Sequence, residues 1–134
     1  METAAQPAKD SKGMLWTGRV LSVLPALLLL LSGAMKLTKM AAVIQGFVHG
    51  GLAESLIVPI GILEISCAVV YLIPQTAVLG AILMCAYLGG ATVTNLRVGD
   101  PWWPPILAGV LVWAGLFLRD RRVRSLLPLR SSDR

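Results

Sequence analysis

The sequence predicts an all-α protein, a membrane-spanning four-helix bundle with a short interfacial helix between spans 1 and 2. Of the 134 residues, 56% are hydrophobic and only 14% are charged, whereas a soluble domain carries roughly 25% charged residues. The apolar residues gather in four long runs within a chain that has the length of one domain. This composition excludes a disordered chain and argues against a soluble globule.

The two ends of the chain differ from its middle. Residues 1–13 are polar and carry four charges without an apolar period, so we expect a disordered tail. Residues 14–120 contain the four apolar runs and form the predicted transmembrane domain. Residues 121–134 are rich in arginine and form a predicted basic tail.

The first predicted span runs from Leu15 to Met35. Its one charge, Arg19, stands near the start, where a long side chain reaches the lipid headgroups. Pro25 lies inside the run, and we expect it to kink the helix. A secretory signal peptide is the competing interpretation, because the run has a basic start, a leucine-rich centre and a Ser-Gly-Ala sequence at residues 32–34.

The second and third predicted spans form a tight helical hairpin. They run from Leu56 to Ile73, with Glu64 as the single ionisable group, and from Thr76 to Leu96, with none. Pro74 separates them, because proline disfavours helical geometry at the residue before it.

The fourth predicted span, Trp102 to Leu118, is the shortest. Its 17 residues reach about 26 Å, against a hydrocarbon core of about 30 Å. Trp102 and Trp103, beside three prolines, are typical of a helix that starts at the membrane interface.

The segment from Lys36 to Ser55 is too polar to cross a membrane. It still carries apolar residues at helical spacing, so we expect a short helix on the membrane surface, ended by His49 and two glycines. The apolar residues are Met40, Val43, Ile44, Phe47 and Val48.

The basic residues predict the orientation. Nine of the twelve lie at the tail side of the bundle and three at the opposite side, namely Lys36, Lys39 and Arg97. The positive-inside rule then gives a multi-pass protein of the cytoplasmic (inner) membrane with both termini in the cytoplasm. The arginines after the fourth span are expected to contact anionic lipids, and they do not indicate nucleic-acid binding. They are Arg119, Arg121, Arg122 and Arg124.

Glu64 is the strongest candidate for a functional residue. A carboxylate inside a span costs roughly 2.5 to 3.5 kcal/mol on the insertion scale, so it needs a partner or a proton. Polar residues lie at similar depth where the first and third spans end. Ser32 lies one helical turn before Lys36 in the first span. Together they predict an outward-facing polar pocket that binds a ligand or handles a proton, formed by Lys36, Glu64, Thr92, Thr94 and Asn95. The alternative is an ion pair of Lys36 and Glu64 that only fixes helix packing.

Two stripes of mainly small residues are expected to pack together in the hairpin. One is Ala77, Ala81, Cys85 and Gly89, and the other is Gly61, Glu64, Cys67, Ala68 and Tyr71. The two cysteines lie at similar distances from the turn near residue 75. They are either a redox pair or two small packing residues, and burial favours the second interpretation.

Cofactor chemistry is constrained by what the sequence lacks. His49 is the single histidine, which excludes a haem held by two histidines of one chain, and there is no glycine-rich nucleotide loop, His and Cys metal cluster or Ser, His and Asp set. No catalytic residue and no intrinsic cofactor are therefore assigned. Any cofactor is shared with a partner or soluble in lipid, as a quinone is.

Several segments of the chain resemble those of a known family, and they occur in the order and at the spacing found in that family. They are residues 32–37 (SGAMKL), 61–64 (GILE), Pro74 followed by 76–81 (TAVLGA), 90–100 (GATVTNLRVGD), and 109–113 with 118–121 in the last span. From about Arg19 to Arg130 the chain resembles the DoxX-like family of small four-helix membrane proteins. The resemblance implies a four-helix bundle and, for some relatives, association with quinone-linked sulfur oxidation or membrane thiol-redox complexes. Relatives often have histidine where this chain has Asn95, which removes a titratable group from the predicted pocket.

These observations lead to one functional hypothesis and two alternatives. The first is an accessory subunit, without catalytic activity of its own, of a membrane oxidoreductase complex that contacts quinone and a membrane protein partner or further copies of this chain. The second is a scaffold or assembly factor that holds other membrane proteins. The third is a small-solute or proton conduit built from an oligomer.

Overall fold

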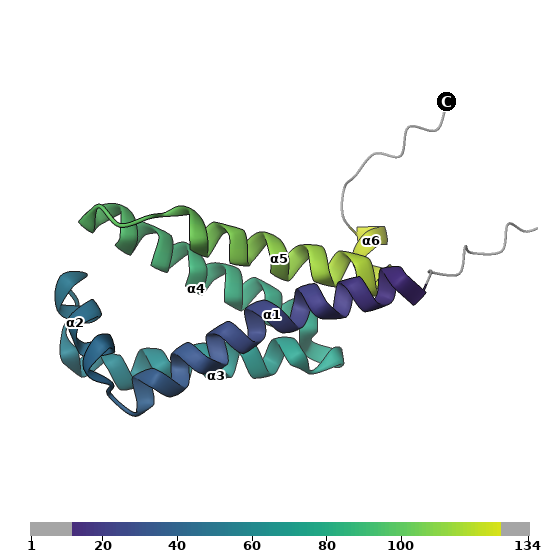
Figure 1. Cartoon of the computed structure of the whole chain (residues 1–134). Helices are drawn as coiled ribbons and strands as arrows, with labels where there is room; N and C mark the ends of the chain where they lie inside the picture. Colours follow the sequence, from purple (N-terminus) through teal and green to yellow (C-terminus); the bar gives the residue numbers. More distant parts are fainter. Residues whose placement is uncertain (1–11, 127–134) are drawn as a thin grey trace, which may run out of the picture.

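The computed structural model describes residues 12–126, and within this range every regular element is a helix. Four long helices pack as a bundle (Figure 1), which confirms the predicted fold class. They are α1 (Lys12–Leu37), α3 (Ile57–Leu72), α4 (Ala77–Val98) and α5 (Trp103–Arg119). The shorter elements are α2 (Ala41–His49), α6 (Arg121–Leu126) and the 3₁₀ turns η1 (Glu54–Leu56) and η2 (Pro74–Thr76).

The order of the helices around the bundle is α1, α3, α4, α5. Helix α1 packs against α3 and α5, and α4 packs against the same two helices from the other side. The start of α1 lies beside α6 at one end of the bundle, whereas α2 lies at the other end with the connection between α4 and α5 (Figure 1). Both described ends of the chain therefore lie at one end of the bundle.

The helix boundaries agree closely with the predicted spans. The break of the hairpin falls at Ile73, whose backbone is extended (φ −78°, ψ 119°) because Pro74 follows it. Thr76 then donates a hydrogen bond from Oγ1 to the carbonyl oxygen of Val70 at 2.8 Å, which closes the turn. Helix α1 continues without interruption through Pro25, which is buried.

The predicted tails are described only in part. Most of the expected disordered tail, residues 1–11, and the end of the basic tail, residues 127–134, lie outside the described residues. Lys12 and Gly13, assigned to the tail, belong to α1, and the first six residues of the basic tail form α6.

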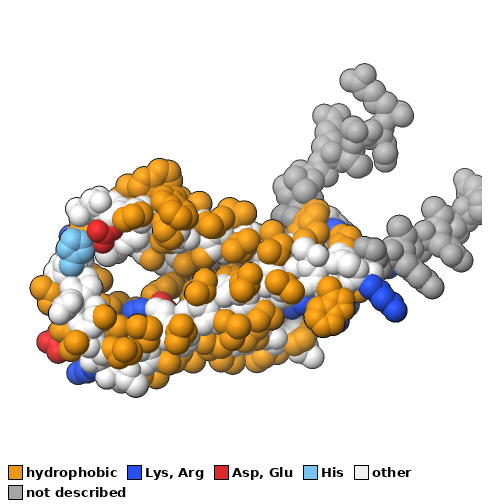
Figure 2. Space-filling view, viewed as in Figure 1, with side chains coloured by type: hydrophobic (Ala, Val, Ile, Leu, Met, Phe, Trp, Pro, Cys, Tyr) orange, Lys and Arg blue, Asp and Glu red, His pale blue; other side chains and the backbone are white. Residues whose placement is uncertain are grey.

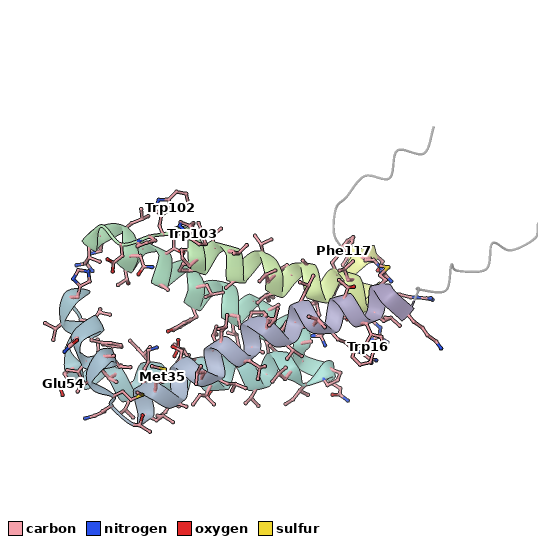
Figure 3. All side chains as sticks on the ribbon, in the orientation of Figure 1. Trp16, Met35, Glu54, Trp102, Trp103 and Phe117 are labelled. Carbon is pink, nitrogen blue, oxygen red and sulfur yellow. The ribbon has the colours of Figure 1, made fainter. Side chains whose placement is uncertain are left out.

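The outer surface of the bundle is apolar. Three helical stretches are long and apolar enough to cross a membrane, Lys12–Leu37, Glu54–Leu72 and Pro74–Val98, and α5 is a shorter apolar helix. Hydrophobic side chains cover the bundle in the space-filling view (Figure 2). Exposed tryptophans lie near both ends, Trp16 at one and Trp102 and Trp103 at the other (Figure 3), where indole rings favour the headgroup level. The chain is a multi-pass membrane protein in contact with lipid.

Glycines allow the closest helix contacts. A Cβ at Gly18 in α1 would lie 3.0 Å from the carbonyl oxygen of Gly115 in α5, and Gly33 approaches Gly61 in α3 as closely. Gly80 in α4 packs on the backbone of Tyr71. Small residues permit such approach, which increases van der Waals contact between membrane helices.

The two predicted stripes are buried to different extents. All five residues of the α3 stripe are buried, as expected. On α4, Ala77 and Ala81 are buried, but Gly89 is exposed and Cys85 is only half-buried. Gly80, Met84 and Leu88 complete the buried face instead, so the inward face of α4 is rotated from the predicted one.

Candidate functional site

Glu64 lies at the centre of a hydrogen-bonded network that joins α1, α3 and α4. The residue is only 3% exposed. Its Oε2 lies 2.8 Å from Nζ of Lys36, and Oγ of Ser32 lies 3.1 Å from both carboxylate oxygens. Tyr87 donates a hydrogen bond from its hydroxyl to Oε1. The ion pair that the sequence offered as one alternative is thus present.

The crossing of α1 and α3 brings this ion pair together. A Cβ added at Gly61 would lie 2.9 Å from Cβ of Lys36, so the stem of Lys36 passes directly over the glycine. Glu64 follows Gly61 by about one helical turn and projects from the same side of α3. Lys36 also donates a hydrogen bond to Oγ of Ser32, at 2.7 Å. Every partner of the carboxylate therefore donates a hydrogen bond, which compensates for burying its charge.

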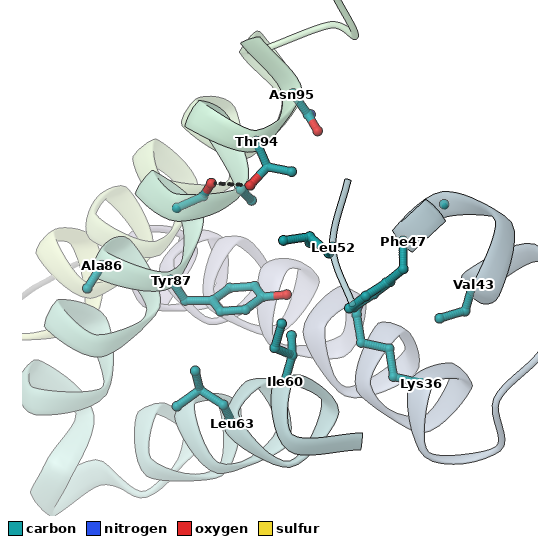
Figure 4. A pocket seen from close by; sticks show the side chains of 13 residues that line it. Lys36, Val43, Phe47, Leu52, Ile60, Leu63, Ala86, Tyr87, Thr94 and Asn95 are labelled. Carbon is teal, nitrogen blue, oxygen red and sulfur yellow. Dashed lines mark hydrogen bonds between the residues drawn. The ribbon is translucent and has the colours of Figure 1, made fainter. Parts of the chain in front are cut away.

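A cavity of about 540 Å³ lies beside the network (Figure 4). Its volume falls in the range of small-molecule sites, about 300 to 1,000 Å³. Lys36 and Tyr87 belong both to the network and to the cavity wall, whereas Glu64 lies behind them and is not part of the wall. The remaining wall is largely apolar and is formed by Val43, Gly46, Phe47, Leu52, Ile60, Leu63, Ala86, Gly90, Ala91, Thr94 and Asn95.

Helix α2 forms one wall of this cavity. Phe47 is its buried residue, and with Val43 and Gly46 it faces the cavity. The end of α2 contacts the connection between α4 and α5 through a hydrogen bond, in which Nε2 of His49 lies 3.1 Å from Oδ1 of Asp100. In Figure 2 a hollow separates α2 from the body of the bundle, with the histidine at its rim. The predicted short helix is therefore present; of its apolar residues Val43 and Phe47 face the cavity, whereas Met40 and Val48 are exposed.

Three of the five predicted site residues line this cavity, namely Lys36, Thr94 and Asn95. Thr94 donates to the carbonyl oxygen of Gly90 at 2.9 Å, and Nδ2 of Asn95 donates to that of Pro101 at 2.8 Å. Both side chains thus also stabilise local backbone, around the last turns of α4.

Thr92 does not share the cavity. It lines a separate cavity of about 140 Å³ with Cys85, Gly89 and Gly109, on the side of α4 that faces α5. Successive side chains on a helix point in directions about 100° apart. Ala91 faces the larger cavity, so Thr92, the next residue, points away from it.

Comparison with known proteins agrees with this architecture. The model of the DoxX-like family matches residues 20–117, which includes most of α1 and all of α2, α3 and α4. The chain belongs to the DoxX-like family. No curated protein and no solved structure gives a match.

Tyr87 is the site residue of this DoxX-like protein that sequence reasoning missed. The sequence contained an indication of this contact, because Glu64 and Tyr87 lie almost equally far from the turn near residue 75 and hence at similar depth in the bundle. Depth alone does not say which face of α4 turns inward, and the stripe of small residues pointed to the neighbouring face.

The two thiols of the DoxX-like bundle are both free. Cys67 is buried in the core, and Sγ of Cys85 accepts a hydrogen bond from Nε1 of Trp113 at 3.0 Å. Each therefore packs within the bundle without a bond to the other. Among residues 12–126 no group of three or more His, Cys, Asp or Glu side chains is placed to hold a metal ion.

Proposed function

We propose that this DoxX-like protein is an accessory subunit of a membrane oxidoreductase complex and that its 540 Å³ cavity binds the ring of a quinone. One observation carries the proposal: the wall of a largely apolar cavity of small-molecule size contains an ammonium and a phenol. These groups are Lys36 and Tyr87. Apolar walls with a few convergent polar groups are typical of sites for such ligands.

The hydrogen bonds leave capacity for both forms of a quinone. Lys36 uses two of its three N–H donors, on Ser32 and Glu64, and the third suits a quinone carbonyl oxygen. Tyr87 donates to Glu64, so its oxygen can still accept a hydrogen bond from a quinol hydroxyl. Glu64, as an acceptor only, is a positioning residue that orients both groups. The quinone supplies the electron-carrying chemistry, and the chain supplies binding and orientation.

The orientation and the partners follow from charge. We place both termini in the cytoplasm, with the cavity and α2 toward the opposite face of the cytoplasmic membrane. The basic residues that follow α5 contact anionic lipid at the cytoplasmic face, as the positive-inside rule and the surface potential of that face favour. The redox partner is a second membrane protein or a complex that contains further copies of this chain.

Titration of the full-length protein with a short-chain ubiquinone analogue tests the proposal. In nonionic detergent the analogue should raise the unfolding temperature, and Tyr87→Phe should weaken its binding about tenfold, equivalent to about 1.4 kcal/mol for one hydrogen bond. Tyr71→Phe is the matched control, because the Tyr71 hydroxyl donates to the carbonyl oxygen of Val112, away from the cavity.

A second pair of variants tests the cavity by volume. Gly90→Leu would place a side chain in the cavity, whereas Gly89→Leu would not, and an added Cβ meets no atom within 4 Å at either position. Only Gly90→Leu should abolish binding. Equal binding by all four variants would reject the quinone site and favour the scaffold or conduit hypotheses.

A further inference from the structure

A second cavity lies at the end of the bundle where α1 begins and α5 ends. It measures about 260 Å³ and brings together three segments, the first turns of α1, the turn between α3 and α4, and the end of α5. Its walls are formed by Leu15, Arg19, Pro74, Ala77, Leu116, Arg119 and Asp120. Two of the seven are arginines from opposite ends of the sequence, so only the folded bundle places them together.

Arg119 is held in a defined position. Its backbone packs against α1, where a Cβ at Gly18 would lie 2.9 Å from the Arg119 nitrogen. Its guanidinium carbon lies 5.3 Å from the ring centroid of Tyr71, and Tyr71 is itself fully buried. A guanidinium stacked on a buried ring loses little conformational freedom when it binds a ligand.

Two of the three nitrogens of the Arg119 guanidinium lack hydrogen-bond acceptors. Nε and Nη2 are both shielded from solvent and have no hydrogen-bond partner. Buried N–H groups nearly always have an acceptor. Nε and one terminal nitrogen form the fork that binds two oxygens of a phosphate or carboxylate. Arg119 lines the cavity, and an anion with two oxygens that entered beside its guanidinium would supply the missing acceptors.

Arg19 supplies the second positive charge. It is exposed, lines the same cavity, and its guanidinium carbon lies 5.9 Å from the ring centroid of Trp16. The cavity wall also contains one carboxylate, Asp120, whose Oδ1 accepts a hydrogen bond from the backbone nitrogen of Arg122 at 2.8 Å. This hydrogen bond directs one oxygen of Asp120 to the start of α6. Two cations against one carboxylate leave the cavity positive.

We propose that Arg19 and Arg119 bind the phosphate group of an anionic membrane phospholipid. Arg119 supplies the fork beneath the hairpin turn, Arg19 closes the site from α1, and the apolar side chains of Leu15 and Leu116 lie beside the start of the acyl chains. This inference rests on the proposal that this end of the bundle meets an anionic lipid surface. It does not depend on quinone binding, which we assign to the other end.

Lipid titration of the purified full chain in nonionic detergent tests the site. Phosphatidylglycerol should raise the unfolding temperature and remain bound in native mass spectrometry, and phosphatidylcholine should do so less. Arg119→Gln and Arg19→Gln should each weaken the effect of phosphatidylglycerol at least tenfold. Should Arg119→Gln fail to fold, Arg19→Gln still decides the matter, because Arg19 is exposed.

Lys12→Gln is the matched control, since it removes one exposed charge from the start of α1 at the same end without touching the cavity. It should change the effect less than twofold. Equal losses in Lys12→Gln and Arg19→Gln, or no loss in any variant, would overturn the proposal in favour of diffuse attraction. Stabilisation by inorganic phosphate but not by phosphatidylglycerol would overturn the lipid assignment and identify a site for a soluble anion. Quinone binding, measured on the same variants, should stay unchanged, so the two proposals fail separately.

Discussion

Gly33 of α1 and Gly61 of α3 lie backbone against backbone. A Cβ at Gly33 would lie 2.9 Å from the carbonyl oxygen of Gly61, and one at Gly61 would lie 3.0 Å from that of Gly33. The crossing holds Lys36 within reach of Glu64, so the packing of two glycines determines the geometry of the ion pair.

Gly61→Ala should destabilise the bundle by about 1 to 3 kcal/mol, because the added methyl meets backbone and the stem of Lys36. The control is Gly89→Ala, where a Cβ meets nothing within 4 Å; it should be neutral or stabilising by up to about 1 kcal/mol, since alanine favours helix. Thermal unfolding in detergent measures both. Equal stability of the two variants would show that the crossing tolerates expansion.

Removing one member of the ion pair should cost more than removing both. Lys36→Met leaves the Glu64 carboxylate buried without its ammonium, and we expect a loss of about 3 to 5 kcal/mol. Adding Glu64→Gln should restore much of this loss, because the neutral amide needs no counter-charge. A thermodynamic cycle of the two single variants and the double variant measures the coupling. Additive losses would contradict a direct interaction.

Cys67 and Cys85 should not react with a water-soluble maleimide in intact membranes. Cys67 is 2% exposed, and Cys85 is half-buried and its sulfur accepts a hydrogen bond from Trp113. A thiol in an apolar environment stays neutral and unreactive. Replacing both by alanine should preserve the fold. Rapid labelling, or a native crosslink between the two, would instead support the redox pair.

Reporter fusions test the proposed orientation. Reporters on the N-terminal tail and after Arg130 should both give cytoplasmic signals, and one inserted at His49 should give an external signal. Three basic residues lie on the predicted outer side and nine on the other, which is the asymmetry behind this expectation. An external signal from the C-terminal reporter would rule out four spans.

Much of the fold could be predicted, because helix boundaries leave local signals. Pro74 ended one helix at Ile73, as expected, and the end of the apolar period near His49 marked the end of α2. The burial of Glu64 was also predictable, since an isolated carboxylate avoids lipid. The candidate site was predicted in part, with Lys36 and Glu64 paired and with Thr94 and Asn95 on the cavity wall.

The pattern of apolar runs and prolines was enough to predict the four long helices, the short helix between the first two and the need to satisfy one buried charge, although α6 lies within the predicted tail. The helix faces that meet could be identified only from the packed bundle. In the bundle Tyr87 donates a hydrogen bond to Glu64, and Thr92 faces α5. Helix α2 forms a wall of the larger cavity, and Arg19 and Arg119 line the same smaller cavity. The physical reason is that lipid is as apolar as the interior of the bundle, so a membrane helix is apolar on all sides and its hydrophobic pattern does not mark the inward face. That choice depends on the close contacts of glycines and on side-chain hydrogen bonds between helices, which form only when the helices pack together.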